Sequence, residues 1–196
     1  MTPVLIFAKA PVAGKVKTRL LPILDANTAA AFHQTLVEST LLRLKGFSCQ
    51  LWCAPDPHHS FFRHCREQFG IPLFAQGSGD LGEKMQQALE TTLSHHERAL
   101  LIGSDCPGLT AEYIQQAMDG LEDSPAVITP TEDGGFCLIG LRGTFPSGLF
   151  DGIDWGSDRV MEQLRQNLRQ RQQSWQELPK LWDIDRPEDY LRYCRR

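Results

Sequence analysis

The sequence contains no long hydrophobic run and no excess of positive charge. Its first apolar run, Val4 to Ala8, holds five residues, whereas a membrane-spanning helix needs about 20 and a signal peptide also needs a basic N-terminal region. The formal net charge is −4, so the basic face on which general nucleic-acid binding depends is missing. We therefore expect no membrane segment, no signal peptide and no nucleic-acid partner.

Paired cysteines are also missing. The chain has six cysteines, but it contains no Cys-x-x-Cys pair, and the spacing fits neither a disulfide framework nor a zinc finger. Reduced thiols are typical of cytoplasmic proteins, so we expect this protein in the cytoplasm.

The composition is that of an ordinary globular domain. Apolar residues make up 41% and charged residues 22% of the 196 residues, which is enough chain to bury a sizeable core. The sequence shows no internal repeat and no low-complexity linker. We expect residues 1–196 to form a single domain.

Apolar runs alternate with helical patterns along the chain. The runs are nearly continuous, as in parallel strands that are buried on both faces. The expected strands are 4–8, 49–54, 71–74, 99–103, 126–129 and 136–141; the expected helices are 28–45, 80–95, one capped by Thr110 through 121, one capped by Ser157 through 170, and 187–193. This order predicts an α/β fold, a three-layer sandwich around a mixed, mostly parallel sheet. Segment 136–141 is the expected antiparallel strand, because it follows a tight Gly-Gly turn.

A cluster of cations follows the first expected strand, in VLIFAKAPVAGKVKTRLLP. Its spacing does not fit a P-loop, and the dinucleotide fingerprint is absent. In an open α/β sheet, ligands bind beyond the carboxyl ends of the strands, so side chains of this loop are placed to bind a polyphosphate. The alternative is a solvated loop with scattered cations. The expected anion site consists of Lys9, Gly14, Lys15, Lys17 and Arg19.

Two acidic segments follow later strands. Asp105 comes just after the strand ALLIG, and the segment WDIDRPEDY offers Asp183 and Asp185. Pro187 suits the first position of the last helix, which leaves Asp185 unneeded as a cap. Carboxylates suit a hard cation such as Mg²⁺, although Asp105 also fits a turn. We expect Asp105 and Asp185 to meet at one crevice and to share a divalent ion, Mg²⁺ or Mn²⁺.

Two glycine-containing segments supply further candidates. The turn in TEDGGFCLIGL fits a simple hairpin, but its glycines would also let a ligand approach the backbone. The segment SGDLGEKM fits a helix N-terminus whose acid complements the helix dipole. The residues concerned are Asp133, Gly134 and Gly135 in the first segment and Gly79, Asp80 and Gly82 in the second.

The motifs together resemble the nucleotide-diphospho-sugar transferase superfamily, which has the GT-A fold. The closest likeness is to a bacterial group long labelled a domain of unknown function and often named as glycosyltransferases, some in arsenosugar pathways. The motifs span nearly the whole chain in the expected order. They are FAKAPVAGKVKTRL, GDLGEKM, LIGSDCPGLT, DGGFCLIGL, IDWGSDRV and DIDRPEDY.

The resemblance implies a role for each motif. The first loop would hold a nucleotide and its phosphates, and Gly79 through Gly82 would line the base pocket. Asp105 matches the metal-binding aspartate, and Asp185 matches the late carboxylate that completes the metal site in related nucleotidyltransferases. Asp133, Gly134, Gly135 and Trp155 would face the acceptor.

Two features favour nucleotidyl transfer over glycosyl transfer. The Asp-x-Asp of many glycosyltransferases is reduced here to Gly103-Ser104-Asp105, and KVKTRL is similar to the triphosphate-gripping loop of guanylyl- and cytidylyltransferases. We expect a metal-dependent enzyme that transfers a nucleotidyl group from an NTP to a small phosphorylated acceptor, with Lys17 and Arg19 as catalytic residues. Glycosyl transfer to a hydroxyl, with Asp133 as the base, is one alternative. A nucleotide-binding module without turnover is another, and the oligomeric state stays open.

Overall fold

A computed structural model describes residues 1–144 and 146–195. The strands are β1 (Pro3–Lys9), β2 (Ser48–Ala54), β3 (Leu73–Ala75), β4 (Arg98–Gly103), β5 (Ala126–Pro130), β6 (Phe136–Arg142) and β7 (Gln176–Glu177). The helices are α1 (Ala26–Arg43), α2 (Ser60–Phe69), α3 (Leu81–Leu93), α4 (Ala111–Asp123), α5 (Val160–Gln170) and α6 (Pro187–Cys194). Within the described residues, no helix combines the length and the apolar character that a membrane crossing requires.

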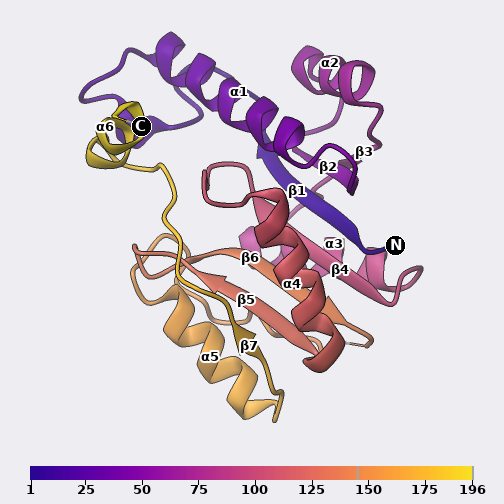
Figure 1. Ribbon diagram of the computed structural model, residues 1–196. Coiled ribbons are helices and arrows are strands. Elements are labelled where there is room, and N and C mark those ends of the chain that lie inside the picture. The colour runs from indigo at the N-terminus through magenta and orange to yellow at the C-terminus, as the bar shows by residue number, and fades with distance from the viewer. Residues whose placement is uncertain (145, 196) are drawn as a thin grey trace.

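The strands form one sheet in the order β3-β2-β1-β4-β6-β5-β7 (Figure 1). Strands β1 to β4 pair in parallel, as do β5 and β7. Strand β6 pairs antiparallel with both of its neighbours, β4 and β5. The mixed, mostly parallel sheet is therefore confirmed, and so is the antiparallel direction of the segment that follows the Gly-Gly turn.

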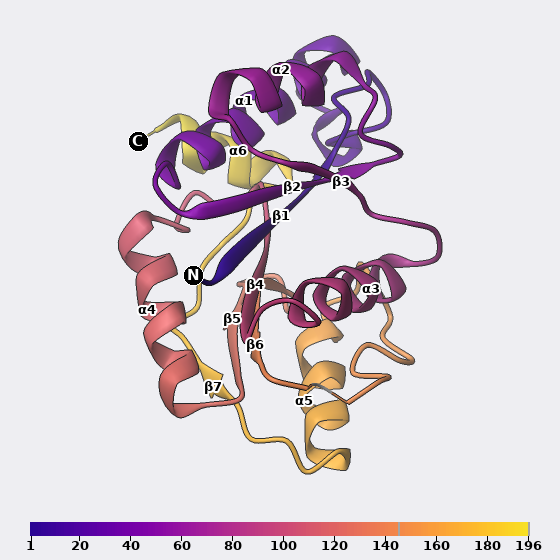
Figure 2. The same ribbon diagram turned by 90° about the vertical axis from the view of Figure 1, so that its right-hand side faces the viewer.

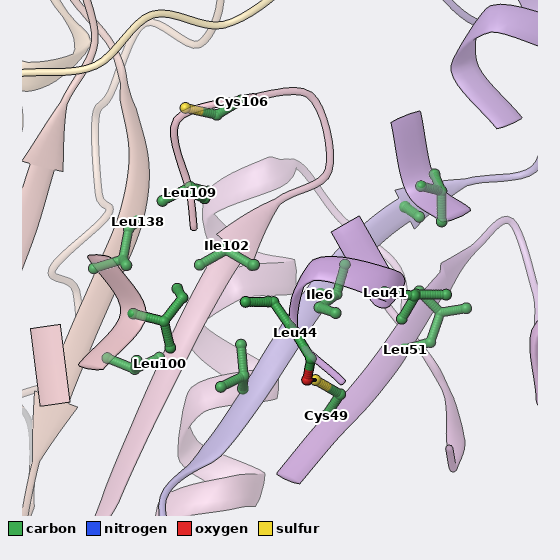
Figure 3. Packing of buried hydrophobic residues seen from close by; sticks show 14 of the residues in the cluster. Ile6, Leu41, Leu44, Cys49, Leu51, Leu100, Ile102, Cys106, Leu109 and Leu138 are labelled. Carbon is green, nitrogen blue, oxygen red and sulfur yellow. Dashed lines mark hydrogen bonds between the residues drawn. The ribbon is translucent and has the colours of Figure 1, made fainter. Parts of the chain in front are cut away.

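Helices cover both faces of the sheet (Figure 2). Helices α1, α2 and α4 pack against one face, where apolar side chains from these helices and from the strands form the larger core (Figure 3). Helices α3 and α5 pack against the other face. Several strand residues in these layers have no exposed surface, among them Ile6, Leu100 and Ile139. Burial on both faces is what the continuous apolar runs predict.

A third, smaller cluster fixes the end of the chain. Trp182 and Ile184 are buried against Leu36 of α1, and the rings of Tyr190 and Tyr193 in α6 pack around Phe32. Strand β7, which no sequence pattern predicts, leads into this segment after pairing with β5. The chain thus returns from β7 to α1, next to the loop that follows β1.

Most helix starts follow local chemistry. Asp80 accepts a hydrogen bond from the Glu83 amide, and Thr110 accepts one from the Tyr113 amide, as expected of N-caps. The predicted cap at Ser157 is wrong, because α5 begins only at Val160. The Ser157 hydroxyl instead accepts from the Arg159 amide, inside the turn that precedes the helix.

The carboxyl ends of the parallel strands lie along one edge of the sheet. The loop after β1, the Ser104-Asp105 segment after β4 and the 131–135 turn after β5 all leave from this edge. Because β6 runs in the opposite direction, its first residue also lies there. The segment that follows β7 crosses the same edge, since Ile184 N donates to Asp105 O at 3.0 Å.

The 131–135 turn is tied to the start of α5 through Gly134. Met161 N donates to Gly134 O at 2.8 Å. Gly134 has a φ of +90°, and a Cβ atom at this position would lie 2.0 Å from the carbonyl oxygen of Asp158. Only glycine fits here, because the neighbouring atom belongs to the backbone and cannot move away as a side chain would.

We expect Gly134→Ala to lower the free energy of unfolding by about 3 kcal/mol or more, through the clash and the left-handed backbone together. Gly143→Ala is the matched control, because Gly143 has a φ of +72° and a Cβ atom added there would have nothing within 4 Å; it should cost only about 1 kcal/mol. Urea unfolding curves of both variants measure the difference. Equal losses would contradict the packing described at Gly134.

Candidate functional site

A cavity of about 350 Å³ opens beyond the carboxyl ends of β1 and β4. Its volume falls in the range of small-molecule sites, and it lies where open α/β sheets bind ligands. Four of the residues that line it are cations from the end of β1 and the loop after it, and two are acids from segments far along the chain. These residues are Lys9, Lys15, Lys17, Arg19, Asp105 and Asp185.

Lys17 is the most buried of the four cations that line the first cavity. It is only 6% exposed, and its Nζ lies 2.9 Å from Asp105 Oδ2. The same Nζ donates to the carbonyl oxygen of Ile184. Its backbone is left-handed, with φ 47° and ψ 37°, a conformation that costs a residue with a side chain free energy. Lys17 therefore joins three chain segments and is held there against local strain.

The other cations are more exposed than Lys17, and they differ in whether they form an ion pair. Arg19 is half-exposed and forms an ion pair with Asp185. Within the described residues, neither Lys9 nor Lys15 takes part in an ion pair, and both are exposed. Of the four cations, Lys9 and Lys15 are thus the ones that an incoming anion would meet without displacing a protein partner.

The carboxyl group of Asp105 is held in its charged form. Burial alone would raise its pKa, but the charge and the hydrogen bond of Lys17 outweigh burial, so the pKa lies below its ordinary value. The Asp105 carboxylate is therefore ionised at neutral pH, as a metal ligand must be.

Asp183 is a further acid near this cavity, although it does not line it. Burial, followed by the charges of Asp105 and Asp133, raises its pKa to about 7. Asp183 and Asp185 flank Ile184, which is fully buried. The acid–apolar–acid spacing is the sequence signal that identifies Asp183 together with Asp185.

Asp133 and Trp155 line a second cavity, of about 200 Å³. The two cavities are neighbours, because Phe7, Leu81 and Gly103 line both. Asp133 Oδ1 accepts hydrogen bonds from Thr131 Oγ1 at 2.5 Å and from Gly135 N at 3.0 Å. The hairpin interpretation of this turn is thus correct, and the same turn also presents a carboxylate to a cavity.

Several residues expected at the site lie outside the first cavity. Among the described residues that line it, the segment 79–82 contributes only Leu81. Asp80 caps α3, and Gly82 packs against Phe150 and Trp155. Gly14 is exposed in the loop after β1 and does not line the cavity.

Two buried polar residues line the first cavity although no sequence pattern indicates them. His33 Nε2 lies 2.9 Å from Lys9 O, and burial lowers the pKa of His33. Gln76 Nε2 donates to Ala8 O at 3.3 Å and to Trp52 O at 2.8 Å. Both side chains hold the carboxyl end of β1 in place. A single histidine or glutamine in a helix or loop has no motif that would reveal this role.

The acids of the first cavity have the chemistry of a site for a hard divalent ion. Asp105 and Asp185 supply oxygen donors, which Mg²⁺ and Mn²⁺ prefer. Burial, and after it the charges of Asp105 and Asp133, raise the pKa of Asp183, and a cation would offset the repulsion between these carboxylates. Within the described residues, no three His, Cys, Asp or Glu side chains are arranged as a complete metal cage. A metal ion here would need further oxygen ligands from water or from a bound phosphate.

The sequence matches the profile of one protein family over residues 36–157. That family is described as "Uncharacterized protein conserved in bacteria (DUF2064)". No curated protein matches the sequence.

Several solved structures have a fold similar to that of this chain. A candidate nucleotide-diphospho-sugar transferase from Desulfovibrio desulfuricans G20 is 31% identical, with a TM-score of 0.84 over 95% of this chain and 84% of its own. The 4-diphosphocytidyl-2C-methyl-D-erythritol synthase of Anaerococcus prevotii DSM 20548 is 13% identical, with a TM-score of 0.64 over 100% and 99% of the two chains. The manganese complex of Rv0371c from Mycobacterium tuberculosis H37Rv is 17% identical, with a TM-score of 0.53 over 100% and 99%. The GT-A-like fold expected from the resemblance is confirmed.

The shifted pKa of Asp183 predicts a loss of stability with rising pH. The folded protein keeps this proton up to about pH 7, whereas the unfolded chain releases it near the ordinary value of 3.8. The Asp183 carboxyl group should therefore contribute a loss of stability between about pH 4 and pH 7, which is measured as the difference between the wild type and a variant without this group. Asp183→Asn should remove this loss, and at pH 8 it should be more stable than the wild type by at most about 4 kcal/mol, at 1.36 kcal/mol per pKa unit.

Urea unfolding between pH 4 and pH 8, with a chelator present, measures this effect. Asp123→Asn is the control, because Asp123 is exposed at the end of α4, on the opposite edge of the sheet. If the stabilities of the wild type and of Asp183→Asn change in parallel between pH 4 and pH 8, Asp183 does not keep its proton in the folded protein.

Proposed function

Because the chain belongs to the DUF2064 family, whose description names no reaction, we propose a function from the geometry of the site. The protein is a metal-dependent nucleotidyltransferase that binds a nucleoside triphosphate in the first cavity. It transfers the nucleotidyl group to a small phosphorylated acceptor in the second. Residues 1–196 act as one catalytic domain.

One observation carries this proposal: cations and carboxylates line the same cavity at the carboxyl edge of the sheet. A cation cluster alone would bind many anions, and a pair of acids alone would bind many metal ions. A triphosphate with its divalent ion would need both: carboxylates that would hold the ion, and cations that would bind the phosphate groups. The cavity offers both from segments that are far apart in sequence.

Asp105 and Asp185 are the residues that would hold Mg²⁺ or Mn²⁺. When bound, the ion would supply charge stabilisation at the phosphate oxygens. Asp105 is ionised by its pairing with Lys17, and Asp185 is held near the cavity by Arg19. Asp183 lies close enough to Asp105 for their charges to interact, so it adds negative charge to the same site once it loses its proton.

The cations would bind the triphosphate and stabilise the pyrophosphate that leaves. Lys15 and Lys9 are exposed and carry no ion pair in the described residues, so each can bind a phosphate directly. Arg19 would move from Asp185 to the phosphate oxygens at the reacting centre, near the border of the two cavities, because its side chain is half-exposed and can change partner. Lys17 is nearly buried, and its part is to fix Asp105 and the 183–185 segment while it adds positive charge to the wall.

In the transfer step, an oxygen of the acceptor phosphate would form a bond to the α-phosphorus of the nucleotide. The bond between this phosphorus and the bridging oxygen would break, and pyrophosphate would leave with the electron pair. A phosphate oxygen is already deprotonated at neutral pH, so no protein base is needed. The protein would contribute position and fixed charge.

The comparisons support a transferase that handles nucleotides. The related structure from Desulfovibrio desulfuricans carries the name of a nucleotide-diphospho-sugar transferase, and the Anaerococcus structure is a 4-diphosphocytidyl synthase. The Mycobacterium structure is a manganese complex, which supports a divalent ion.

Glycosyl transfer from a nucleoside diphosphate sugar is the second candidate function. It is favoured by Asp133, whose carboxylate lines the second cavity and could accept the proton of an attacking hydroxyl group. The two reactions differ in what leaves: pyrophosphate in nucleotidyl transfer, and a nucleoside diphosphate in glycosyl transfer. Incubation with each NTP and with several NDP-sugars, in Mg²⁺ or Mn²⁺, followed by identification of the released product, distinguishes them.

Replacing the exposed cation Lys15 should weaken nucleotide binding without affecting folding. We expect Lys15→Ala to reduce the affinity for an NTP with Mg²⁺ about tenfold, since a charge-assisted hydrogen bond contributes roughly 1.5–3 kcal/mol. Lys45→Ala is the matched control, an exposed lysine beyond the other end of α1. Isothermal titration calorimetry measures the affinities. If the two variants bind the nucleotide equally well, Lys15 does not contact a phosphate and the loop is a solvated one.

Lys17→Ala should behave differently from Lys15→Ala. It leaves the Asp105 carboxylate and the Ile184 carbonyl without their partner, so we expect a loss of about 1–3 kcal/mol in the free energy of unfolding. Thermal and urea unfolding measure this loss. If Lys17→Ala proves as stable as the wild type, Lys17 is not the connection between the three segments.

A further inference from the structure

The second cavity has a mostly apolar wall, although it adjoins the first cavity, which is lined by cations. Apolar and aromatic side chains from β1, α3, β4, β6 and the turn before α5 form most of it. They include Phe7, Leu81, Met85, Leu101, Phe136 and Trp155. The rings of Phe136 and Trp155 meet edge to face, with their centroids 6.3 Å apart. Such a wall removes apolar surface of a ligand from water.

The charges of this wall are as informative as its apolar surface. The described residues that line the second cavity include no lysine, arginine or histidine, and the one ionisable carboxyl group is that of Asp133. A second anionic group on a ligand would therefore find no cation inside this cavity. It would also be repelled by Asp133.

Positive charge lies at the border between the two cavities. Arg19 lines the first cavity, and its Nη2 would lie 3.7 Å from a Cβ atom placed on Gly156, which lines the second. Arg19 also interacts with the charge of Asp133. An anionic group at this border would be within reach of the guanidinium, while the rest of the molecule extended into the apolar space.

We infer that the acceptor is a phosphate monoester of a small apolar alcohol, whose only negative charge is the reacting phosphate. This inference rests on the proposed nucleotidyl transfer and names the substrate class of the same site. The phosphate lies at the border beside Arg19, and the apolar body lies between Phe136, Trp155 and Met85. Acceptors that carry a second anionic group, such as a carboxylate, are excluded by Asp133 and by the lack of a cation among the described residues of this wall.

Three phosphate monoesters test this assignment by calorimetry with the wild-type protein. Phenyl phosphate has an apolar body, methyl phosphate has almost none, and 3-phosphoglycerate carries a second anionic group. Burial of apolar surface contributes roughly 25 cal/mol per Å², so we expect phenyl phosphate to bind at least about tenfold more tightly than methyl phosphate. We expect 3-phosphoglycerate to bind the most weakly. Equal affinities, or tightest binding of 3-phosphoglycerate, would overturn the inference.

Variants of a residue in the second cavity test whether the phosphate monoesters bind there. Phe136 lines the second cavity and not the first, so Phe136→Ala should remove the preference for phenyl phosphate, and Phe136→Leu should restore most of it. Phe69→Ala is the matched control, because Phe69 is partly buried against the core on the opposite face of the sheet. A preference that survives in folded Phe136→Ala would overturn the location. The wild-type series decides the substrate class even if that variant does not fold.

The ester series is measured both without nucleotide and with each NTP and Mg²⁺, which separates this inference from the proposed function. If no NTP binds, nucleotidyl transfer fails, and the series without nucleotide still shows whether the cavity selects an apolar monoester. If an NTP binds but phenyl phosphate has no advantage, the proposed function stands and the inference fails.

Discussion

The contact of Lys17 with Asp105 and with the carbonyl oxygen of Ile184 is the interaction on which the rest of the site depends. It joins the loop after β1, the end of β4 and the segment before α6, which lie far apart in the sequence. An ammonium group in this position neutralises the Asp105 carboxylate and satisfies a carbonyl group at once. The Asp185 carboxylate and the Asp183 carboxyl group take their places because the segment that carries them is anchored here.

The fold was largely predictable because its signals are local. Continuous apolar runs identify β1 to β6, and side-chain caps identify the starts of α3 and α4. Strand β7 escapes prediction because its two residues, Gln176 and Glu177, are exposed and form a strand only by pairing with β5. The start of α5 was misplaced because the hydroxyl group of Ser157 bonds within a preceding turn, and no local pattern distinguishes that turn from a cap.

The charged residues that line the first cavity were predictable as residue types, but their partners were not. Charge density indicates the cations after β1, and position after a strand indicates Asp105. The sequence cannot show that Lys17 is nearly buried while Lys15 is exposed, since both follow from how the loop packs on the distant segment 182–185. The raised pKa of Asp183 is unpredictable for the same reason, because it depends on burial and then on the charges of Asp105 and Asp133, which only the fold brings near.

Strand β6 runs antiparallel to both of its neighbours, so its first residues lie at the same edge of the sheet as the two cavities. Each cavity is lined mainly by a different part of the chain. The first cavity is built mainly from residues 7–105, with Asp185 added, whereas the second takes much of its wall from residues 133–160. Substitutions in the turn before β6 or in the turn before α5 can therefore reshape one wall while the cation loop keeps its own anchoring. In evolutionary terms, such a layout lets a lineage change the lining of one cavity while most of the lining of the other is inherited unchanged.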